Sequence, residues 1–451
     1  MKYLRFLMII VSLCMISCEG ELDILPQQSI AEGPATATAD NIEAILIGAY
    51  DTAGGDANGL LDDGNYDGDL ANIAVLFGNT DQVDWNGTFA NLRDVYFKQM
   101  VNNNTGATTA YGNFYLMFGA TNTVIANLDK FTDQTRRDRV EGEAKFLRGL
   151  GYFDMVRLFG QQYNAGGGNT QLGVPIVLDL PDATRLIPRN TVEEVYTQVI
   201  ADLTDAYNKL PDSNGIRADK YVARAVLARV YLQQGNFAAA RDAADDVIQN
   251  SGHSLMPNFN AVFDSDDNTS ETLFSWVITT QEGQNWHVVH FATEALGGRD
   301  GDISIADAYL DKFDSDLDER KNYNYFSDTG LRLTSKYTRQ FSNTEQIRLA
   351  EMHLIRAESN FREGTSVGLD PLVEINTLRA RSSAPALGSL TLDLILNERE
   401  LELGFEGFVL YDYKRTQRNI GGLPYNDNKL VFPIPQSARD RNSLLDQNPG
   451  Y

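Results

Sequence analysis

The chain has 451 residues, with 38 Lys and Arg against 62 Asp and Glu, which gives a formal net charge of −24 at pH 7. Apolar residues make up 43% of it, the composition of a folded protein rather than of a disordered one. The strong negative charge argues against a nucleic-acid partner, because like charges repel. With only four His and two Cys, a Cys/His metal cluster is nearly excluded by counting.

The N-terminus has the features of a secretory signal. Lys2 and Arg5 form a basic region, which is followed by an apolar stretch over residues 6–16. That stretch is too short to span a bilayer, which takes about 20 residues. Small Ser17 directly before Cys18 is similar to the bacterial lipobox, in which the cysteine becomes the lipidated first residue.

Two readings of this segment stay open, an ordinary secretory signal and a lipoprotein signal. We favour the second, because Cys is rare in this chain and Cys18 stands at the expected place. This predicts a signal peptide over residues 1–17, a lipid (palmitate) anchor at Cys18 and an extended tether over residues 18–39. The protein would then be held at a membrane by lipid rather than by a spanning segment.

Helical periodicity dominates the chain after the tether. Capping-box patterns, Asp40 with Glu43 and Thr191 with Glu194, predict the starts of two helices. Further helices are predicted over residues 113–130, 136–159, 219–234, 237–250, 345–363 and 391–404, and after Pro371. Two irregular inserts, rich in Gly, Asn and Asp, cover residues 51–110 and 252–340. Short strands are expected in the second insert, at Thr272–Thr279 and Val288–Phe291. Residues 429–451 are predicted to be extended.

The helix pair over residues 219–250 fits the tetratricopeptide pattern. Small Ala228 and Ala240 permit close approach of the two helices, and Tyr231 fills the groove between them. One such match also fits any helical hairpin, but the neighbouring long helices favour the repeat. No linker divides the chain, so we predict a mostly α protein with one domain over residues 40–451, in which tetratricopeptide-like helix pairs carry a loop-rich half with short strands.

Many segments, in order along the chain, resemble the SusD/RagB family of Bacteroidota. The most specific is the run Asn397–Gly407, which contains four glutamates. The other segments that carry the resemblance are Cys18 and residues 142–153, 157–160, 173–176, 350–358, 376–381, 412–415, 432–435 and 447–451.

The resemblance implies a SusD-like α-α superhelix that holds a looped ligand-binding half. It also implies a lipoprotein of the cell outer membrane, which faces the exterior, binds a nutrient glycan in polysaccharide utilisation and passes it as a lid to a SusC-like TonB-dependent barrel. The alternative is a lid of the RagB type, which binds peptides or protein fragments. The resemblance implies neither catalysis nor a cofactor.

The charged run could suggest glycosidase chemistry, because Glu398 and Glu402 stack one turn apart on a helix. The alternative is a set of ion pairs that lock this helix to Lys414 and Arg415, and we favour it. No Ser/His/Asp set has supporting motifs, so we predict no catalytic residue. His287 and His290 lie three apart without a partner motif, which argues against a metal site there.

An acidic loop, residues 63–68, fits the first six positions of a calcium-binding loop. Its oxygen ligands would come from Asp63, Asn65 and Asp67. The twelfth position is Ala74 instead of the bidentate Glu. The sequence therefore favours a solvated turn, with calcium as the alternative.

A glycan site needs exposed aromatic rings that stack on the apolar faces of sugars, flanked by polar side chains. Such residues are expected in the two irregular inserts, because binding residues favour loops on a rigid scaffold. Trp276 alternates within a strand-like run and is predicted to belong to the core. The net charge favours a neutral ligand such as a glucan. The predicted ligand-binding residues are Trp85 with Asp84, Trp286 with His287, Tyr323 and Tyr325.

Overall fold

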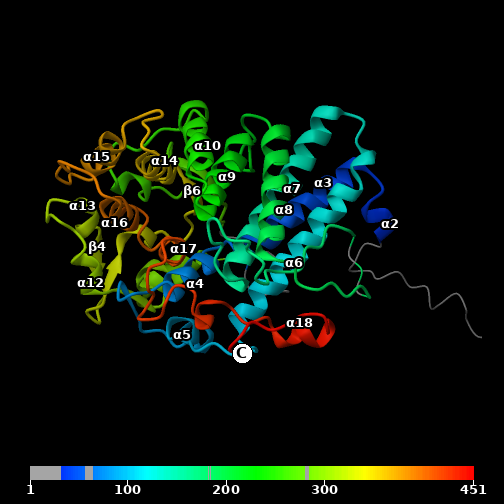
Figure 1. The fold of residues 1–451 in the computed structure, drawn as a ribbon, viewed down its shortest axis with the longest axis horizontal. Coiled ribbons are helices and arrows are strands. Elements are labelled where there is room, and N and C mark those ends of the chain that lie inside the picture. Colours follow the sequence, from blue (N-terminus) through cyan, green and yellow to red (C-terminus); the bar gives the residue numbers. More distant parts are fainter. Residues whose placement is uncertain (1–31, 56–63, 181, 183, 280–283) are drawn as a thin grey trace, which may run out of the picture.

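The computed structural model describes residues 32–55, 64–180, 182, 184–279 and 284–451, and Figure 1 shows their arrangement. The predicted signal peptide and Cys18 lie outside these ranges. The helices are α2 (Glu32–Ala35), α3 (Ala39–Gly54), α4 (Asp69–Phe77), α5 (Ala90–Tyr96), α6 (Thr105–Ala126), α7 (Gln134–Phe159), α8 (Val192–Lys209), α9 (Lys220–Gln234), α10 (Phe237–Asn250), α11 (Trp286–Phe291), α12 (Asp307–Leu310), α13 (Glu319–Asn322), α14 (Leu349–Glu363), α15 (Pro371–Arg381), α16 (Leu392–Glu402), α17 (Val409–Arg415) and α18 (Gln436–Arg441).

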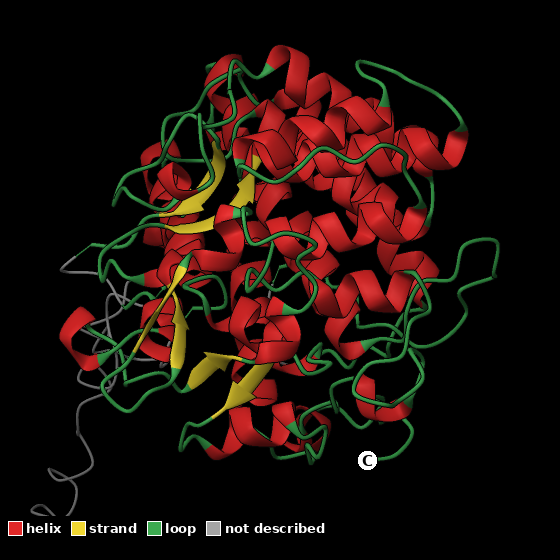
Figure 2. Cartoon of the chain, turned by 90° about the vertical axis from the view of Figure 1, so that its left-hand side faces the viewer, coloured by secondary structure: helices red, strands yellow, loops and turns green. Residues whose placement is uncertain are grey.

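Short antiparallel strand pairs accompany the helices. Pairing joins β1 to β3, β2 to β6 and β4 to β5, so each sheet has two strands. Figure 2 shows all of them on one side of the molecule, with long helices on the other. The strands are β1 (Val83–Trp85), β2 (Thr272–Trp276), β3 (Ile303–Ile305), β4 (Asn324–Phe326), β5 (Arg332–Thr334) and β6 (Thr344–Arg348). This is the mostly α architecture, with a loop-rich half, that the sequence predicts.

The long helices pack in sequence order, α6 on α7, α7 on α8, α8 on α9 and α9 on α10. In the pair α9–α10, Ala228, Ala240 and Ala244 are fully buried, so small side chains let the two helices approach closely. Gly235 joins them in the left-handed region, with φ of 73°, a conformation that favours glycine. The tetratricopeptide-like spacing therefore has the packing role that the sequence predicts.

The buried core is continuous from the long helices into the strand-bearing half. One apolar cluster includes residues from Ile42 in α3 to Leu445 near the C-terminus, and a smaller cluster joins α14, α15 and α16. Trp276 in β2 is only 4% exposed and stacks on Tyr66, with ring centroids 4.9 Å apart. The prediction that Trp276 belongs to the core is confirmed.

The capping box predicted at Asp40 is wrong. Thr38 caps α3 instead, because its hydroxyl accepts a hydrogen bond from the backbone N–H of Asn41 at 3.2 Å. Glu43 turns toward α7, where its carboxylate pairs with Arg136 at 2.8 Å. At α8 the capping box of Thr191 is present as predicted.

Other boundaries differ from the predicted ones for local reasons. Helix α6 begins at Thr105, eight residues earlier than predicted, because the side chain of Asn104 caps it. The run at Val288–Phe291 belongs to helix α11 rather than to a strand, since Asn285 caps its start. Residues 345–348 belong to strand β6, which pairs with β2, rather than to a helix.

The two ends of the described chain also contain short helices. Residues 32–35 of the predicted extended tether form α2, and α18 interrupts the extended C-terminus. Among the described residues, no helix combines the length and the apolar character that a membrane crossing requires.

Candidate functional site

Two of the predicted tryptophans meet at one place, although 201 positions separate Trp85 and Trp286 in the sequence. Both rings are tilted neighbours of the imidazole of His290, with centroids 6.1 Å from it for Trp85 and 5.4 Å for Trp286. Phe89 completes the group at 5.7 Å from His290 and 6.5 Å from Trp286. We call these four residues the aromatic cluster.

Local structure fixes the positions of both tryptophans. Trp85 ends strand β1, where it pairs with Ile303 of β3. Trp286 begins α11, and its backbone N–H donates to the carbonyl of Asp67 at 2.9 Å. Its own carbonyl accepts from the side chain of Asn72 at 2.9 Å. The loop before α4 and α4 itself therefore hold the first residue of α11 from both sides.

A polar rim surrounds the aromatic cluster. The Nδ1 atom of His290 lies 3.0 Å from a carboxylate oxygen of Asp302, and the Nε atom of Arg299 donates to the same oxygen at 3.0 Å. The guanidinium of Arg299 lies 4.6 Å from the ring centroid of Phe89 and also donates to the hydroxyl of Thr88 at 3.1 Å. Asp302 therefore orients both the imidazole and the guanidinium.

A cleft of about 340 Å³ opens beside this cluster, between α4, α5, the start of α6 and α11. Its volume falls in the range of small-molecule binding pockets. Apolar rings and polar side chains alternate on its walls. The residues that line the cleft include Phe89, Trp286, His290, Asn65, Asp69, Asn91, Thr105 and Thr109.

The two indole N–H groups of the aromatic cluster are available as hydrogen-bond donors. The Nε1 atoms of Trp85 and Trp286 are buried, and neither has a hydrogen-bond partner among the described residues. A buried N–H without a partner loses free energy, about 1–3 kcal/mol. A hydroxyl-bearing ligand that reached either indole would recover part of that loss.

His287, the neighbour of Trp286, points away from the aromatic cluster. Its Nδ1 atom lies 2.7 Å from the side-chain oxygen of Asn72, and its ring stacks on Tyr337 at 4.3 Å. Burial lowers the pKa of His287 to about 3, so the ring is neutral at physiological pH. The structure gives His287 a place in the interior rather than in the cleft.

The remaining predicted residues also lie apart from the cluster. Asp84 is exposed, and it points to the opposite face of β1 from Trp85 because side chains alternate along a strand. The hydroxyl of Tyr323 donates to Asp264 at 3.2 Å, and burial raises the pKa of Tyr323. The hydroxyl of Tyr325 accepts from the backbone N–H of Thr293 at 3.3 Å.

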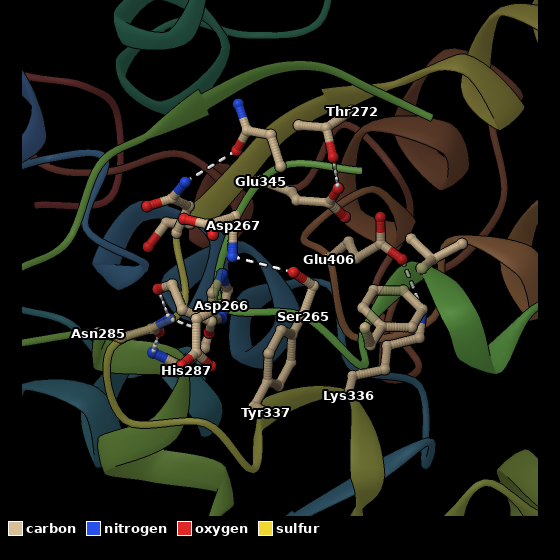
Figure 3. Close-up of a pocket in the computed structure, with 16 residues that line it drawn as sticks. Ser265, Asp266, Asp267, Thr272, Asn285, His287, Lys336, Tyr337, Glu345 and Glu406 are labelled. Carbon is tan, nitrogen blue, oxygen red and sulfur yellow. Dashed lines mark hydrogen bonds and ion pairs between the residues drawn. The ribbon is translucent and has the colours of Figure 1, made fainter. Parts of the chain in front are cut away.

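Figure 3 shows a second, smaller pocket, which His287 and Tyr337 line from one side. Its volume is about 40 Å³, enough for a water molecule but not for a sugar ring. Glu345 points into it, and its Oε1 atom accepts from the hydroxyl of Thr272 at 2.6 Å. Burial raises the pKa of Glu345 to about 7. This pocket is a small polar site rather than a place for a glycan.

The residues of the predicted calcium loop are engaged within the protein. Asp63 lies outside the described residues. The side chain of Asn65 donates to the carbonyl of Ala110, and a carboxylate oxygen of Asp67 accepts from the backbone N–H of Asp69. In the described part of the chain, no three His, Cys, Asp or Glu residues gather in a way that suits a metal ion.

The four glutamates of the run at 398–406 form ion pairs, as predicted, but the predicted partners are wrong. Glu398 pairs with Arg320 at 2.6 Å and with Arg379 at 2.9 Å. Lys414 instead donates to the carbonyl of Leu430, and Arg415 pairs with Glu358. The arginines come from segments distant in sequence, so spacing within the run carried no signal for them.

Glu402 shows how firmly these carboxylates are held. It pairs with Arg348 at 2.7 Å and also with Arg381 and Arg320. Burial acts to raise its pKa, but the guanidinium charges of Arg381 and Arg348 outweigh burial and hold the pKa of Glu402 well below its usual range. A carboxylate held ionised in this way is a poor general acid.

Comparison with known proteins places the chain in a family. A family model described as starch-binding and associating with the outer membrane matches residues 37–232, and the model of the SusD family matches residues 314–429. "SusD-like protein P2" of Formosa agariphila is 24% identical over the full length of both chains. A SusD-like protein of Bacteroides ovatus is 26% identical over 67% of this chain and 64% of its own.

Solved structures agree with this placement. A SusD superfamily protein from Bacteroides thetaiotaomicron superposes with a TM-score of 0.81 at 27% identity, over 91% of this chain and 100% of that one. A putative sugar binding protein from Bacteroides vulgatus gives a TM-score of 0.80 at 24% identity, over 92% and 99% of the two chains. The chain belongs to the SusD/RagB family.

Proposed function

We propose that this protein binds a nutrient glycan in the cleft beside the aromatic cluster and does not transform it. The observation that carries the proposal is the convergence of Trp85, Phe89, Trp286 and His290 next to a cleft of about 340 Å³. Aromatic rings receive the apolar C–H faces of sugars, and the polar groups of the rim meet the hydroxyls.

The relatives support this class of ligand. One family model is described as starch-binding, and one similar structure is described as a putative sugar binding protein. The carboxylates that could suggest hydrolysis are committed to arginines, as Glu398 and Glu402 show. A binding role rather than a catalytic one is the simpler account of both observations.

The charges around the cleft favour an uncharged glycan. Arg299 is a cation next to the aromatic cluster, and Asp302 already pairs with it at 3.0 Å. Asp69 lines the cleft and contributes negative charge. With a net charge of −24 on the whole chain, a polyanionic ligand would be repelled at long range.

The protein is further proposed to act at the cell surface. Lipidation at Cys18 would hold it on the outer membrane, facing the exterior, and the description of one family model as associating with the outer membrane supports that location. A SusC-like TonB-dependent barrel would be the partner that receives the glycan.

Affinity electrophoresis of the mature protein tests the ligand class. Gels that contain soluble starch, laminarin or xylan represent neutral glycans, and a gel with alginate represents polyanions. We expect the protein to migrate more slowly in at least one neutral gel and to show no retardation in the alginate gel. Equal migration in every gel, together with binding to a peptide library, would contradict the proposal and favour the RagB-type alternative.

A further inference from the structure

The β4–β5 hairpin has two different faces. Its register pairs Phe326 with Arg332 and Tyr325 with Leu333. Leu333 is fully buried, and the hydroxyl of Tyr325 contacts the backbone of Thr293, so this pair faces the protein. Phe326 belongs to the opposite face because side chains alternate along a strand. It is 61% exposed, although it is a large aromatic residue.

Arg332 packs on the exposed ring of Phe326 and links it to two further polar side chains, Asn324 and Asp307. The guanidinium of Arg332 lies 4.8 Å from the ring centroid, and one of its nitrogens donates to the side-chain oxygen of Asn324 at 3.4 Å. Another nitrogen lies 3.8 Å from the carboxylate of Asp307, which is itself exposed. A lone exposed apolar residue needs no explanation. An exposed ring fixed by an arginine, beside an amide and a carboxylate, has the composition of a carbohydrate-binding surface.

The hairpin rests on the segment that frames the aromatic cluster. The hydroxyl of Thr329, at the hairpin turn, donates to the carboxylate of Asp300 at 3.3 Å. Gly301 packs closely against the buried Leu333. The residues on either side of Asp300 and Gly301 belong to the polar rim, since Arg299 covers Phe89 and Asp302 orients His290. Continuous structure therefore connects the exposed ring of Phe326 with the proposed glycan cleft.

We propose that the outer face of the β4–β5 hairpin, formed by Phe326, Arg332 and Asn324, is a second glycan-binding surface for the same polysaccharide that occupies the cleft. This inference rests on the proposed function. Two contacts on one polymer raise the apparent affinity, because the second contact forms at high effective concentration. A short oligosaccharide fills the cleft alone and gains nothing from the hairpin.

The experiment compares polymer with oligomer for Phe326→Ala and Phe326→Tyr. Polymer binding is measured by affinity electrophoresis in the neutral polysaccharide that retards the wild type, and oligomer binding by calorimetry with its trisaccharide. Phe326→Ala is expected to weaken polymer binding by about tenfold and to leave trisaccharide binding within twofold. Phe326→Tyr, which keeps the ring, is expected to behave as the wild type. Phe361→Ala, at a partly exposed Phe on α14, is the matched control.

The outcomes separate the two claims. If Phe326→Ala binds the polymer as tightly as the wild type, the second surface is refuted and the cleft is untouched. If it weakens trisaccharide and polymer equally, Phe326 belongs to the cleft and the second surface is also refuted. If the wild type binds none of the polysaccharides, the proposed function fails and this inference fails with it. Unchanged melting temperatures in all variants show that the fold is intact.

Discussion

The indole ring of Trp286 lies 5.4 Å from the imidazole of His290, one helical turn further along α11, with 35° between the ring planes. Residues four apart share one face of a helix, so α11 presents both rings to the cleft together. Asp302 holds the imidazole from behind through a 3.0 Å contact to Nδ1. Trp286 therefore packs against an imidazole that is itself held in place by Asp302, which suits a residue that stacks on a sugar.

The support that His290 gives to Trp286 can be measured. His290→Ala removes the imidazole that packs against Trp286 and leaves Asp302 paired with Arg299 alone. We therefore expect glycan affinity to fall by about three- to tenfold. His290→Asn keeps a donor toward Asp302 but loses the ring, and we expect the same loss. Calorimetry with the bound oligosaccharide checks both variants. Full recovery of affinity in His290→Asn would show that the hydrogen bond rather than the ring carries the effect.

Trp276 is the contrasting tryptophan, and its substitution should affect stability alone. It packs on Tyr66 and Phe274 in the core, with ring centroids 4.9 and 5.0 Å away. Trp276→Ala is expected to lower the free energy of unfolding by about 3–5 kcal/mol, the usual cost of deleting a large buried ring. Urea unfolding measures the loss. A binding defect in folded Trp276→Ala, with stability unchanged, would contradict its assignment to the core.

The buried ion pairs around Glu402 should matter for stability and not for turnover. Glu402→Gln removes one negative charge from a buried network, in which Arg348 keeps Glu271 and Glu406 and Arg381 keeps Glu271, and the loss is expected to cost about 3–5 kcal/mol. Asp205→Asn is the matched control, because its pair with Lys145 is half exposed and should cost less than about 1 kcal/mol. Urea unfolding of both variants checks this. Equal costs would refute the assignment, and so would polysaccharide hydrolysis by the wild type that Glu402→Gln abolishes.

The raised pKa of Glu345 should make the stability of the protein depend on pH. Burial raises its pKa from the ordinary 4.5 to about 7 in the folded state. Between these two values the unfolded chain releases the proton while the folded protein keeps it, so stability falls as the pH rises from 4.5 to 7 and changes little above that.

Glu345→Gln removes this titration while keeping the hydrogen bond to Thr272 available. We expect the variant to gain about 3 kcal/mol relative to the wild type between pH 4.5 and pH 8. Urea unfolding at several pH values measures the difference between the two proteins. A difference that stays constant over this range would show that Glu345 has an ordinary pKa in the folded protein.

The helical scaffold was readable from the sequence because its signals are local. The capping box at Thr191, the small residues Ala228 and Ala240, and the glycine at 235 each act within a few residues of their place in the chain. One error arose where a distant residue competes for a side chain. Glu43 pairs with Arg136 of α7 instead of capping α3, which no local pattern could indicate.

The candidate site was readable only in part, for the same reason. Composition pointed to Trp85 and Trp286 as candidates, since both are aromatic residues among polar neighbours in irregular inserts. His290 had a local signal, four residues after Trp286, but the expectation of a strand at 288–291 concealed it. Phe89, Arg299 and Asp302 join the site through tertiary packing alone, so their sequence context gave no signal.

The decisive measurement is calorimetric titration of the wild type and of Trp286→Ala with an oligosaccharide of the polymer that retards the wild type. We predict that Trp286→Ala loses at least about tenfold in affinity while its melting temperature stays close to that of the wild type, because Trp286 lines the cleft at the start of a short helix. Trp85→Ala should show a smaller loss, because Trp85 neighbours His290 without lining the cleft. Wild-type affinity in both folded variants would contradict the account and place the glycan elsewhere on the protein.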